Sequence, residues 1–100
     1  LNDAMRRAGP TCGRWMMTKG VMAEGPVFML LATRAVQAFS DFTPDNDPYG
    51  ERDFGAFDLA GQRMFWKIDY YDRDLRYGSN DASNPSITTR VLTIMLASEY

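Results

Sequence analysis

The fold is decided by residues 54–71, FGAFDLAGQRMFWKIDYY, which predict two antiparallel strands joined by a tight turn. Phe54–Leu59 and Gln62–Tyr71 are rich in aromatic and apolar side chains, as strands usually are. Ala60 and Gly61 stand between them and supply a two-residue turn. The segment therefore predicts a β-hairpin.

The register of this hairpin follows from the turn. Asp58 faces Arg63 across it, and Phe57 faces Met64. An opposite-charge pair and an apolar pair are both favourable cross-strand neighbours. Charge and apolar pattern therefore agree on one register.

Alternation along the strands divides their side chains between two faces. The first face carries Phe57, Met64, Trp66, Ile68 and Tyr70. The second face carries Arg63, Phe65, Lys67, Asp69 and Tyr71. We expect the first face to be the core, with Trp66 and Ile68 among the most buried residues of the protein.

Two longer segments predict helices. Residues 26–40 begin with a proline, which favours the first helical position, and continue with apolar residues at helical spacing. Residues 86–98 follow Asn84-Pro85 and predict a C-terminal helix. The side chains expected to face the sheet from this helix are Ile87, Val91, Ile94 and Met95. Asp in place of Val91 would then bury an unpaired carboxylate.

The shorter elements complete a prediction of the fold class. Residues 1–8 predict a short helix, and part of residues 14–22 predicts a strand. The fold is predicted to be α+β, a small antiparallel sheet built on a central hairpin with two main helices packed on one face. Residues 1–100 fit a single domain, and Leu1 in place of Met suggests truncation at the N-terminus.

Composition excludes several classes of function. The chain has no histidine and one cysteine, which removes histidine-dependent nucleophiles, His-rich zinc sites and thiolate metal clusters. A single cysteine forms no internal disulfide, so we expect a cytoplasmic protein. No apolar stretch is long enough to span a bilayer, and we expect no membrane partner.

Charge is unevenly distributed along the chain. Residues 1–40 carry five basic and two acidic side chains, whereas residues 41–60 carry one basic and six acidic ones. The isoelectric point near 4.9 argues against a dedicated nucleic-acid-binding protein. The acidic segment is therefore the natural place to look for a site.

Four blocks of the sequence resemble a known family. TPDNDPYGERDFGAF, FWKIDYYD and TTRVLTIMLASEY, together with LNDAMRR at the start, are similar to the bacterial family catalogued as domain of unknown function 3768. The family loop usually reads Gly-Glu-His-Asp-Phe-Gly, and Arg52 replaces the histidine here; the family turn is often Asp-Gly, and Ala60-Gly61 replaces it. The resemblance implies no activity and no cofactor. It implies a small bacterial protein, sometimes on plasmids, with an accessory role linked to mobile elements.

The acidic loop has two interpretations. Its oxygen side chains around a glycine imitate a calcium-binding loop: Asp45, Asp47, Glu51 and Asp53. The position that should hold a bidentate glutamate is Ala56, so the pattern fails at its most diagnostic ligand. Alternating Pro, Asp and Asn are also typical of a tight surface turn, in which the side chains cap backbone N–H groups.

The second face of the hairpin is the other candidate. Lys67, Asp69 and Tyr71 project side by side at a spacing of two. Lysine beside aspartate could serve acid–base chemistry or hold an anion. The alternative is a solvated face with weak ion pairs, although Phe65 and Tyr71 are also typical of a contact surface or of a face that a further helix covers.

Three functions follow from these features. The first is a non-catalytic interaction or regulatory module with a protein partner and no cofactor, which we favour over an enzyme. The second is a metal-dependent hydrolase that uses Asp45, Asp47, Glu51 and Asp53. The third is an acidic mimic of nucleic acid, for which a net charge of −2 is small. In each case we expect the site where the acidic loop meets the strand of Lys67, Asp69 and Tyr71. The sequence does not fix an oligomeric state.

Overall fold

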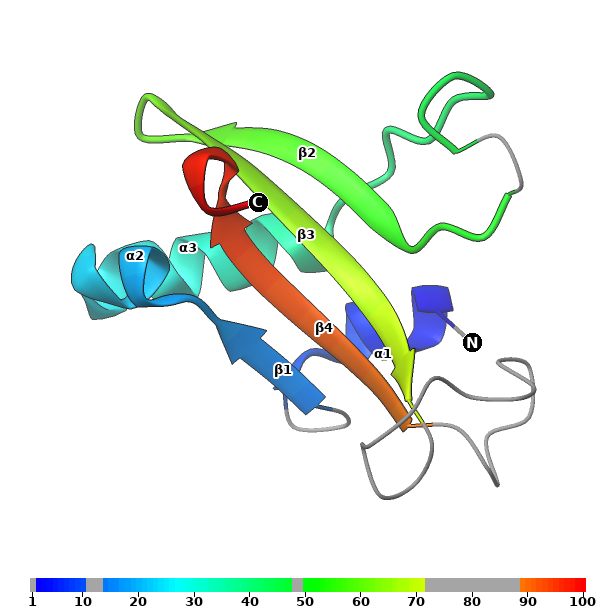
Figure 1. Cartoon of the computed structure of the whole chain (residues 1–100), viewed down its shortest axis with the longest axis horizontal. Coiled ribbons are helices and arrows are strands. Elements are labelled where there is room, and N and C mark those ends of the chain that lie inside the picture. Colours follow the sequence, from blue (N-terminus) through cyan, green and yellow to red (C-terminus); the bar gives the residue numbers. More distant parts are fainter. Residues whose placement is uncertain (1, 11–13, 48–49, 72–88) are drawn as a thin grey trace.

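The computed structural model describes residues 2–10, 14–47, 50–71 and 89–100. Its elements are α1 (Asn2–Ala8), β1 (Arg14–Met17), α2 (Lys19–Ala23), α3 (Pro26–Gln37), β2 (Phe54–Leu59), β3 (Gln62–Tyr71), β4 (Thr89–Leu96) and the 3-10 helix η2 (Ala97–Glu99). Four strands form one sheet in the order β1-β4-β3-β2, and α3 lies across one face of it (Figure 1). The predicted α+β class is confirmed.

The predicted hairpin is confirmed in both bounds and register. β2 and β3 pair antiparallel, with Phe57 opposite Met64 and Asp58 opposite Arg63. Asp58 Oδ1 and Arg63 Nη1 are 3.2 Å apart, and both side chains are largely exposed. An exposed ion pair of this kind contributes little to stability, so the register depends mainly on the apolar face.

The hairpin turn requires a left-handed backbone at both of its central residues. Ala60 has φ 50° and Gly61 has φ 79°. Two positive φ values in succession are the signature of a type I′ turn, which matches the twist of the strands. Glycine adopts this conformation freely, whereas the Cβ of Ala60 makes it costly.

Replacing Ala60 with asparagine is expected to stabilise the protein by about 0.5–1 kcal/mol. Asparagine tolerates the left-handed region much better than alanine does. The measurement is the urea midpoint of unfolding. Ala60→Val is the matched control, because a β-branched side chain at positive φ should shift the midpoint the other way. Equal midpoints for the two variants would contradict the type I′ assignment.

The prediction of a helix over residues 86–98 is wrong. Residues 89–96 form β4, which pairs antiparallel with β3 and parallel with β1. Ile87 and the proposed cap at Asn84 lie outside the described residues. The sheet is therefore mixed, and α1 and α2 accompany α3 in place of a second long helix.

The central position of β4 explains the wrong prediction. Strands on both sides cover it, and its buried residues point to both faces: Val91, Leu92, Ile94 and Met95. A strand buried on both faces is apolar throughout and shows no alternation, so the same residues also fit helical spacing. The β-branched residues of the segment were the signal that favoured a strand.

The core lies between α3 and the sheet, as the alternation of β3 predicted. Trp66 is fully buried and Ile68 is nearly so, which confirms both predictions. The Trp66 ring meets Phe39 and Phe42 edge to face, at centroid distances of 5.5 and 6.2 Å. This geometry is the favourable one for aromatic pairs.

The helix α3 begins for a local reason. Gly25 precedes it with φ 95°, and Pro26 occupies its first turn. Its inner side packs on the sheet through Phe28, Ala32 and Val36. The helix ends at Gln37, three residues earlier than predicted.

Among the described residues, no helix is long and apolar enough to cross a membrane.

The C-terminal segment is held against α2 by one carboxylate. Glu99 accepts hydrogen bonds from the Thr18 hydroxyl and from the backbone N–H groups of Gly20 and Leu96. These bonds, that of Thr18 first, lower the pKa of Glu99 below its usual 4.5. A side chain on Gly20 would displace this carboxylate from its present position.

This contact should make stability depend on pH. Because the pKa of Glu99 is lowered in the folded state, its contribution is present above pH 4.5 and is lost as the pH falls through the lowered pKa. We expect Glu99→Gln to lower the urea midpoint at pH 7. The difference between the urea midpoints of the variant and the wild type should narrow as the pH drops below 4.5. A difference that does not depend on pH would contradict the stabilising role given to the ionised Glu99.

Candidate functional site

The acidic loop is shaped by its own turn-forming side chains. The Thr43 N–H donates to Asn46 Oδ1 at 2.8 Å, and Asn46 Nδ2 donates to the carbonyl of Asp41 at 3.0 Å. Asp47 Oδ1 accepts from the Arg52 N–H at 3.1 Å. Asn46 and Asp47 therefore cap backbone groups, as the turn interpretation of this loop expected.

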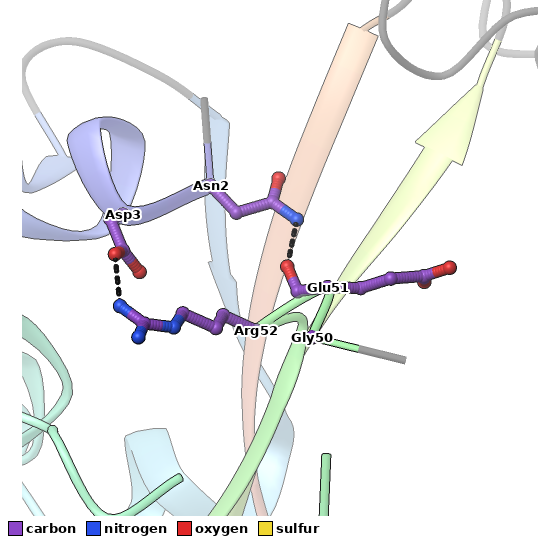
Figure 2. Close-up of a pocket in the computed structure, with 5 residues that line it drawn as sticks. All are labelled: Asn2, Asp3, Gly50, Glu51 and Arg52. Carbon is purple, nitrogen blue, oxygen red and sulfur yellow. Dashed lines mark hydrogen bonds and ion pairs between the residues drawn. The ribbon is translucent and has the colours of Figure 1, made fainter. Parts of the chain in front are cut away.

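Arg52 turns the chain from this loop toward β2. It has φ 53°, a left-handed conformation that is costly for a residue other than glycine. Its guanidinium lies 5.2 Å from the centre of the Phe42 ring, and its Nη1 is 2.7 Å from Asp3 Oδ2 (Figure 2). The only basic side chain of residues 41–60 is thus turned toward α1 and away from the acidic residues of the loop.

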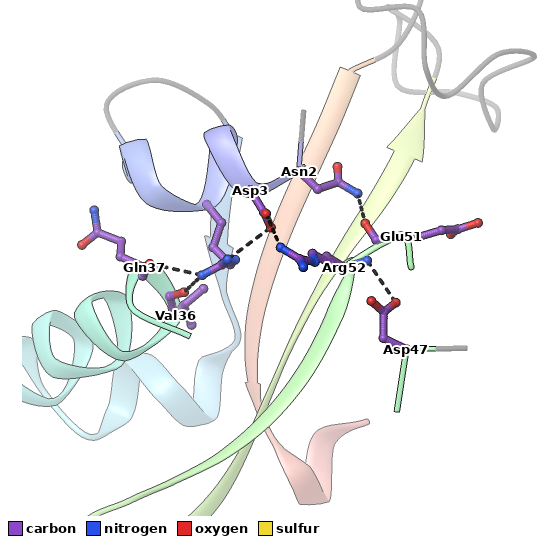
Figure 3. A network of polar contacts seen from close by, with 8 residues as sticks. Asn2, Asp3, Val36, Gln37, Asp47, Glu51 and Arg52 are labelled. Atoms are coloured by element: carbon purple, nitrogen blue, oxygen red, sulfur yellow. Dashed lines mark hydrogen bonds and ion pairs between the residues drawn. The ribbon is translucent and has the colours of Figure 1, made fainter. Parts of the chain in front are cut away.

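Arg6 of α1 is the most buried charged residue of the described chain, with 1% of its surface exposed. Its Nη1 donates to the carbonyls of Val36 and Gln37 at 2.9 and 3.1 Å, at the end of α3 (Figure 3). Its Nη2 is 3.3 Å from Asp3 Oδ1. The Val36 carbonyl also accepts from the Phe39 N–H at 3.2 Å, so Arg6 adds a second donor there and complements the negative end of the helix dipole.

Asp3 joins the two arginines. One of its carboxylate oxygens contacts Arg6 and the other contacts Arg52. Burial opposes the charge of Asp3, but the hydrogen bonds and charges of Arg52 and Arg6 outweigh it and lower the pKa of Asp3. Asp3 therefore stays ionised and fixes Arg52 in place.

A second chain of contacts ties α1 to the sheet. Asn2 Nδ2 donates to the Glu51 carbonyl at 2.9 Å and to the Tyr70 hydroxyl at 2.8 Å, while its Oδ1 accepts from Arg90 Nε at 2.8 Å. The Tyr70 hydroxyl donates to Asp53 Oδ2 at 3.2 Å. Burial, and then the charge of Asp53, raise the pKa of Tyr70, so its hydroxyl remains protonated at neutral pH.

An open polar pocket of about 380 Å³ lies between α1 and the end of the loop. It is lined by Asn2, Asp3, Gly50, Glu51 and Arg52 (Figure 2). Figure 2 shows the Glu51 carboxylate pointing away from α1. The pocket is therefore bounded by the Asp3–Arg52 ion pair and by the backbone of the loop.

Glu51 carries charge that no basic side chain of the described residues offsets. A hydrogen bond with the Asp53 side chain and the negative charge of Asp53, with a further contribution from Asp47, raise the pKa of Glu51. A raised pKa means that the ionised carboxylate is disfavoured by its surroundings. A cation or a basic group placed here would relieve this repulsion.

The structure divides the predicted site residues between the two sides of the sheet. The loop does join β3 where predicted, because the Ile68 N–H donates to the Asp53 carbonyl at 2.8 Å. Asp53 then meets Tyr70 on the side of α1. Lys67 and Asp69 form an ion pair of 3.1 Å on the other face of the sheet. Tyr71 also follows that face by alternation.

The aromatic residues of this other face are partly explained by the end of the chain. Tyr100, which follows η2, lies 5.4 Å from Phe65 and 6.0 Å from Phe54, measured between ring centres. Phe54 and Phe65 are 5.3 Å apart. Tyr100, which exposes 76% of its surface, therefore contacts this face without covering it as a further helix would.

Sequence reasoning missed Asn2, Arg6 and Tyr70. The register already placed Asp53 opposite Ile68, so Tyr70 was its diagonal neighbour on the same face and could have been found. Nothing in the sequence distinguished Arg6 from its exposed neighbour Arg7. Among the described residues, no group of three or more Asp, Glu or Cys side chains is placed to hold a metal ion.

The family that the sequence resembles is confirmed. The model of the family described as protein of unknown function, DUF3768, matches residues 17–99, and the chain belongs to this family. Neither the curated proteins nor the solved structures contain a significant match to the chain. The helix α1 lies outside the matched residues, whereas the residues that it contacts, such as Val36, Glu51 and Tyr70, lie within them.

Proposed function

We propose that this protein is a small non-catalytic interaction module that binds a basic segment of a partner protein at its acidic loop. The observation that supports the proposal is a set of acidic side chains without ion pairs to the described residues: Asp41, Asp45, Asp47, Glu51 and Asp53. Arg52, the basic residue of the same segment, is engaged by Asp3. The loop therefore presents net negative charge on a shaped backbone.

Two further features favour binding over catalysis. The carboxylates with partners serve turns and the Tyr70 contact, and the pocket beside them is polar and open. Enzyme sites are usually concave and largely apolar, with a few convergent polar groups. Charged rims without such a cavity are typical of surfaces that steer and select a charged partner.

A labelled peptide rich in lysine and arginine is the probe for this proposal. We expect it to bind the wild type at low salt and to weaken steeply as salt rises, because exposed charges are screened. The charge reversals Asp45→Lys and Glu51→Lys together should weaken binding at least about tenfold, which corresponds to roughly 1.4 kcal/mol. Fluorescence anisotropy measures both effects.

Asp58→Lys is the matched control for each loop reversal made singly, because it changes the net charge by the same amount on the hairpin away from the loop. Among the described residues its only ion pair is the exposed contact with Arg63, so the fold should tolerate the change. We expect Asp58→Lys to bind the peptide like the wild type. If the loop and hairpin variants weakened binding equally, the binding would be explained by general charge attraction, and the proposal would be refuted.

The alternative of a metal-dependent hydrolase makes a different prediction. A calcium, magnesium or manganese ion bound only by the folded state would raise the melting temperature of the wild type. The rise would disappear in the double variant of Asp45 and Glu51. An acidic mimic of nucleic acid would require a long regular array of charge, and five carboxylates on one loop fall short of it.

A further inference from the structure

The outer side of α3 is apolar like its inner side. Val27, Leu30 and Leu31 expose 71%, 52% and 47% of their surfaces. Met22 of α2, which packs beside α3, exposes 49%. A helix that is apolar all round is normally covered on both sides. We call these four residues the α3 seam. A helix side that faces water would normally carry polar side chains at such positions.

The spacing of the seam is that of a helix–helix contact. The three seam residues of α3 and the Arg34 that follows them are spaced at intervals of three, one and three residues, which places Val27, Leu30, Leu31 and Arg34 on one stripe. The stripe runs for two turns, about 10 Å along the helix. This pattern is the one by which two helices pack side by side.

Opposite charges precede and follow the apolar residues of α3 along the chain. Arg34 follows them, is exposed and makes no ion pair with the described residues. Glu24 precedes Gly25 and is also exposed. Glu24 Oε1 accepts a hydrogen bond from Gln62 at 2.7 Å, and its second oxygen makes no hydrogen bond to the described residues.

We infer that two copies of this chain associate through the α3 seam, with their α3 helices antiparallel about a two-fold axis. A surface with opposite charges at its two ends and apolar side chains between them is complementary to itself after such a rotation. Arg34 of each copy then approaches Glu24 of the other. A parallel arrangement would instead place the two Arg34 side chains together. The second copy is therefore the occupant that this face fits.

The seam is short, so the dimer should be weak, with a dissociation constant of roughly micromolar order. Sedimentation equilibrium between about 5 and 500 µM tests it. We expect the mass to rise from the 11.3 kDa of one chain toward twice that value. A wild-type protein that stays monomeric over this range overturns the inference.

Point variants separate the seam from other exposed apolar residues. Leu30→Glu should be monomeric, because a carboxylate would be buried between apolar side chains. Met16→Glu is the matched control: Met16 exposes 59% of its surface on β1, away from α3, and this variant should dimerise like the wild type. Both positions are exposed, so both variants should fold, which circular dichroism checks. Dimerisation of Leu30→Glu overturns the inference.

A charge swap tests the antiparallel arrangement. Arg34→Glu alone should weaken the dimer about tenfold, because it would meet Glu24 of the other copy. Adding Glu24→Arg should restore association. Failure of the double variant to recover overturns the two-fold arrangement. The loop variants of Asp45 and Glu51 should still dimerise, so this inference and the proposed function can fail separately.

The other occupant of an apolar helical face is a lipid surface. Vesicles of phosphatidylcholine and phosphatidylserine serve as the probe, with wild type and Leu30→Glu compared by co-sedimentation. We expect no binding that depends on Leu30. A monomer that binds these vesicles through Leu30 would assign the face to a membrane and overturn the inference.

Discussion

Replacing Arg6 with methionine is expected to lower the free energy of unfolding by about 3–5 kcal/mol. Two carbonyls at the end of α3, those of Val36 and Gln37, would lose hydrogen bonds to a charged donor. Such bonds contribute roughly 1.5–3 kcal/mol each. Arg6 Nε is buried without a hydrogen-bond partner, which offsets part of the stabilisation by these two bonds. The expected loss is therefore near the lower end of the sum of the two bond energies.

The methionine retains most of the aliphatic volume, so the variant removes charge and hydrogen bonds more than packing. It also removes the contact of the guanidinium with the rings of Phe42 and Trp66, at 5.5 and 5.7 Å. Arg6→Lys should recover only part of the loss, because an ammonium lacks the planar fork that reaches the carbonyls and Asp3 together. The measurement is urea unfolding followed by tryptophan fluorescence.

The control is the adjacent residue of the same helix. Arg7 is exposed, and its side chain makes no hydrogen bond or ion pair to the described residues. Arg7→Met should change the free energy of unfolding by less than about 0.5 kcal/mol. If the two variants were equally stable, the α1 contact would not be part of the folded core.

Replacing Gly55 with alanine is expected to destabilise the protein by about 1–3 kcal/mol. An added Cβ would lie 2.7 Å from Phe39 Cζ and from Trp66 Cε2, with Trp66 Nε1 closer still. The edge of the indole ring therefore rests on the backbone of β2, where only a hydrogen fits. The substitution forces a buried ring to move within a packed core.

A double-mutant cycle with Trp66→Phe shows whether this contact is the cause. The smaller ring leaves space beside β2. The loss of unfolding free energy caused by Gly55→Ala should therefore be at least about 1.5 times as large in the wild type as in the Trp66→Phe background. Coupling between touching residues is the expected result of such a cycle. Purely additive effects would mean that the cost arises from the strand backbone rather than from Trp66.

The hairpin was predictable from local pattern because its pairing is local. Cross-strand neighbours of a two-residue hairpin are close in sequence, so the pairs Asp58–Arg63 and Phe57–Met64 were enough to specify the register. The same register placed Asp53 opposite Ile68 and brought the acidic loop to β3. It did not specify the contacts of the loop: the Asp53 side chain meets Tyr70, which in turn binds Asn2, whereas Asp69 pairs with Lys67 on the other face.

Periodicity and short motifs were sufficient to predict the α+β class, the hairpin, the helix α3 and the family. Long-range packing was needed to make residues 89–96 a central strand, since burial on both faces erases the alternation that marks a strand. Packing also buries Arg6 and exposes Arg7, because that choice depends on where the end of α3 comes to lie against α1. Contacts between segments far apart in the chain, unlike periodicity, leave no local mark in the residues that make them.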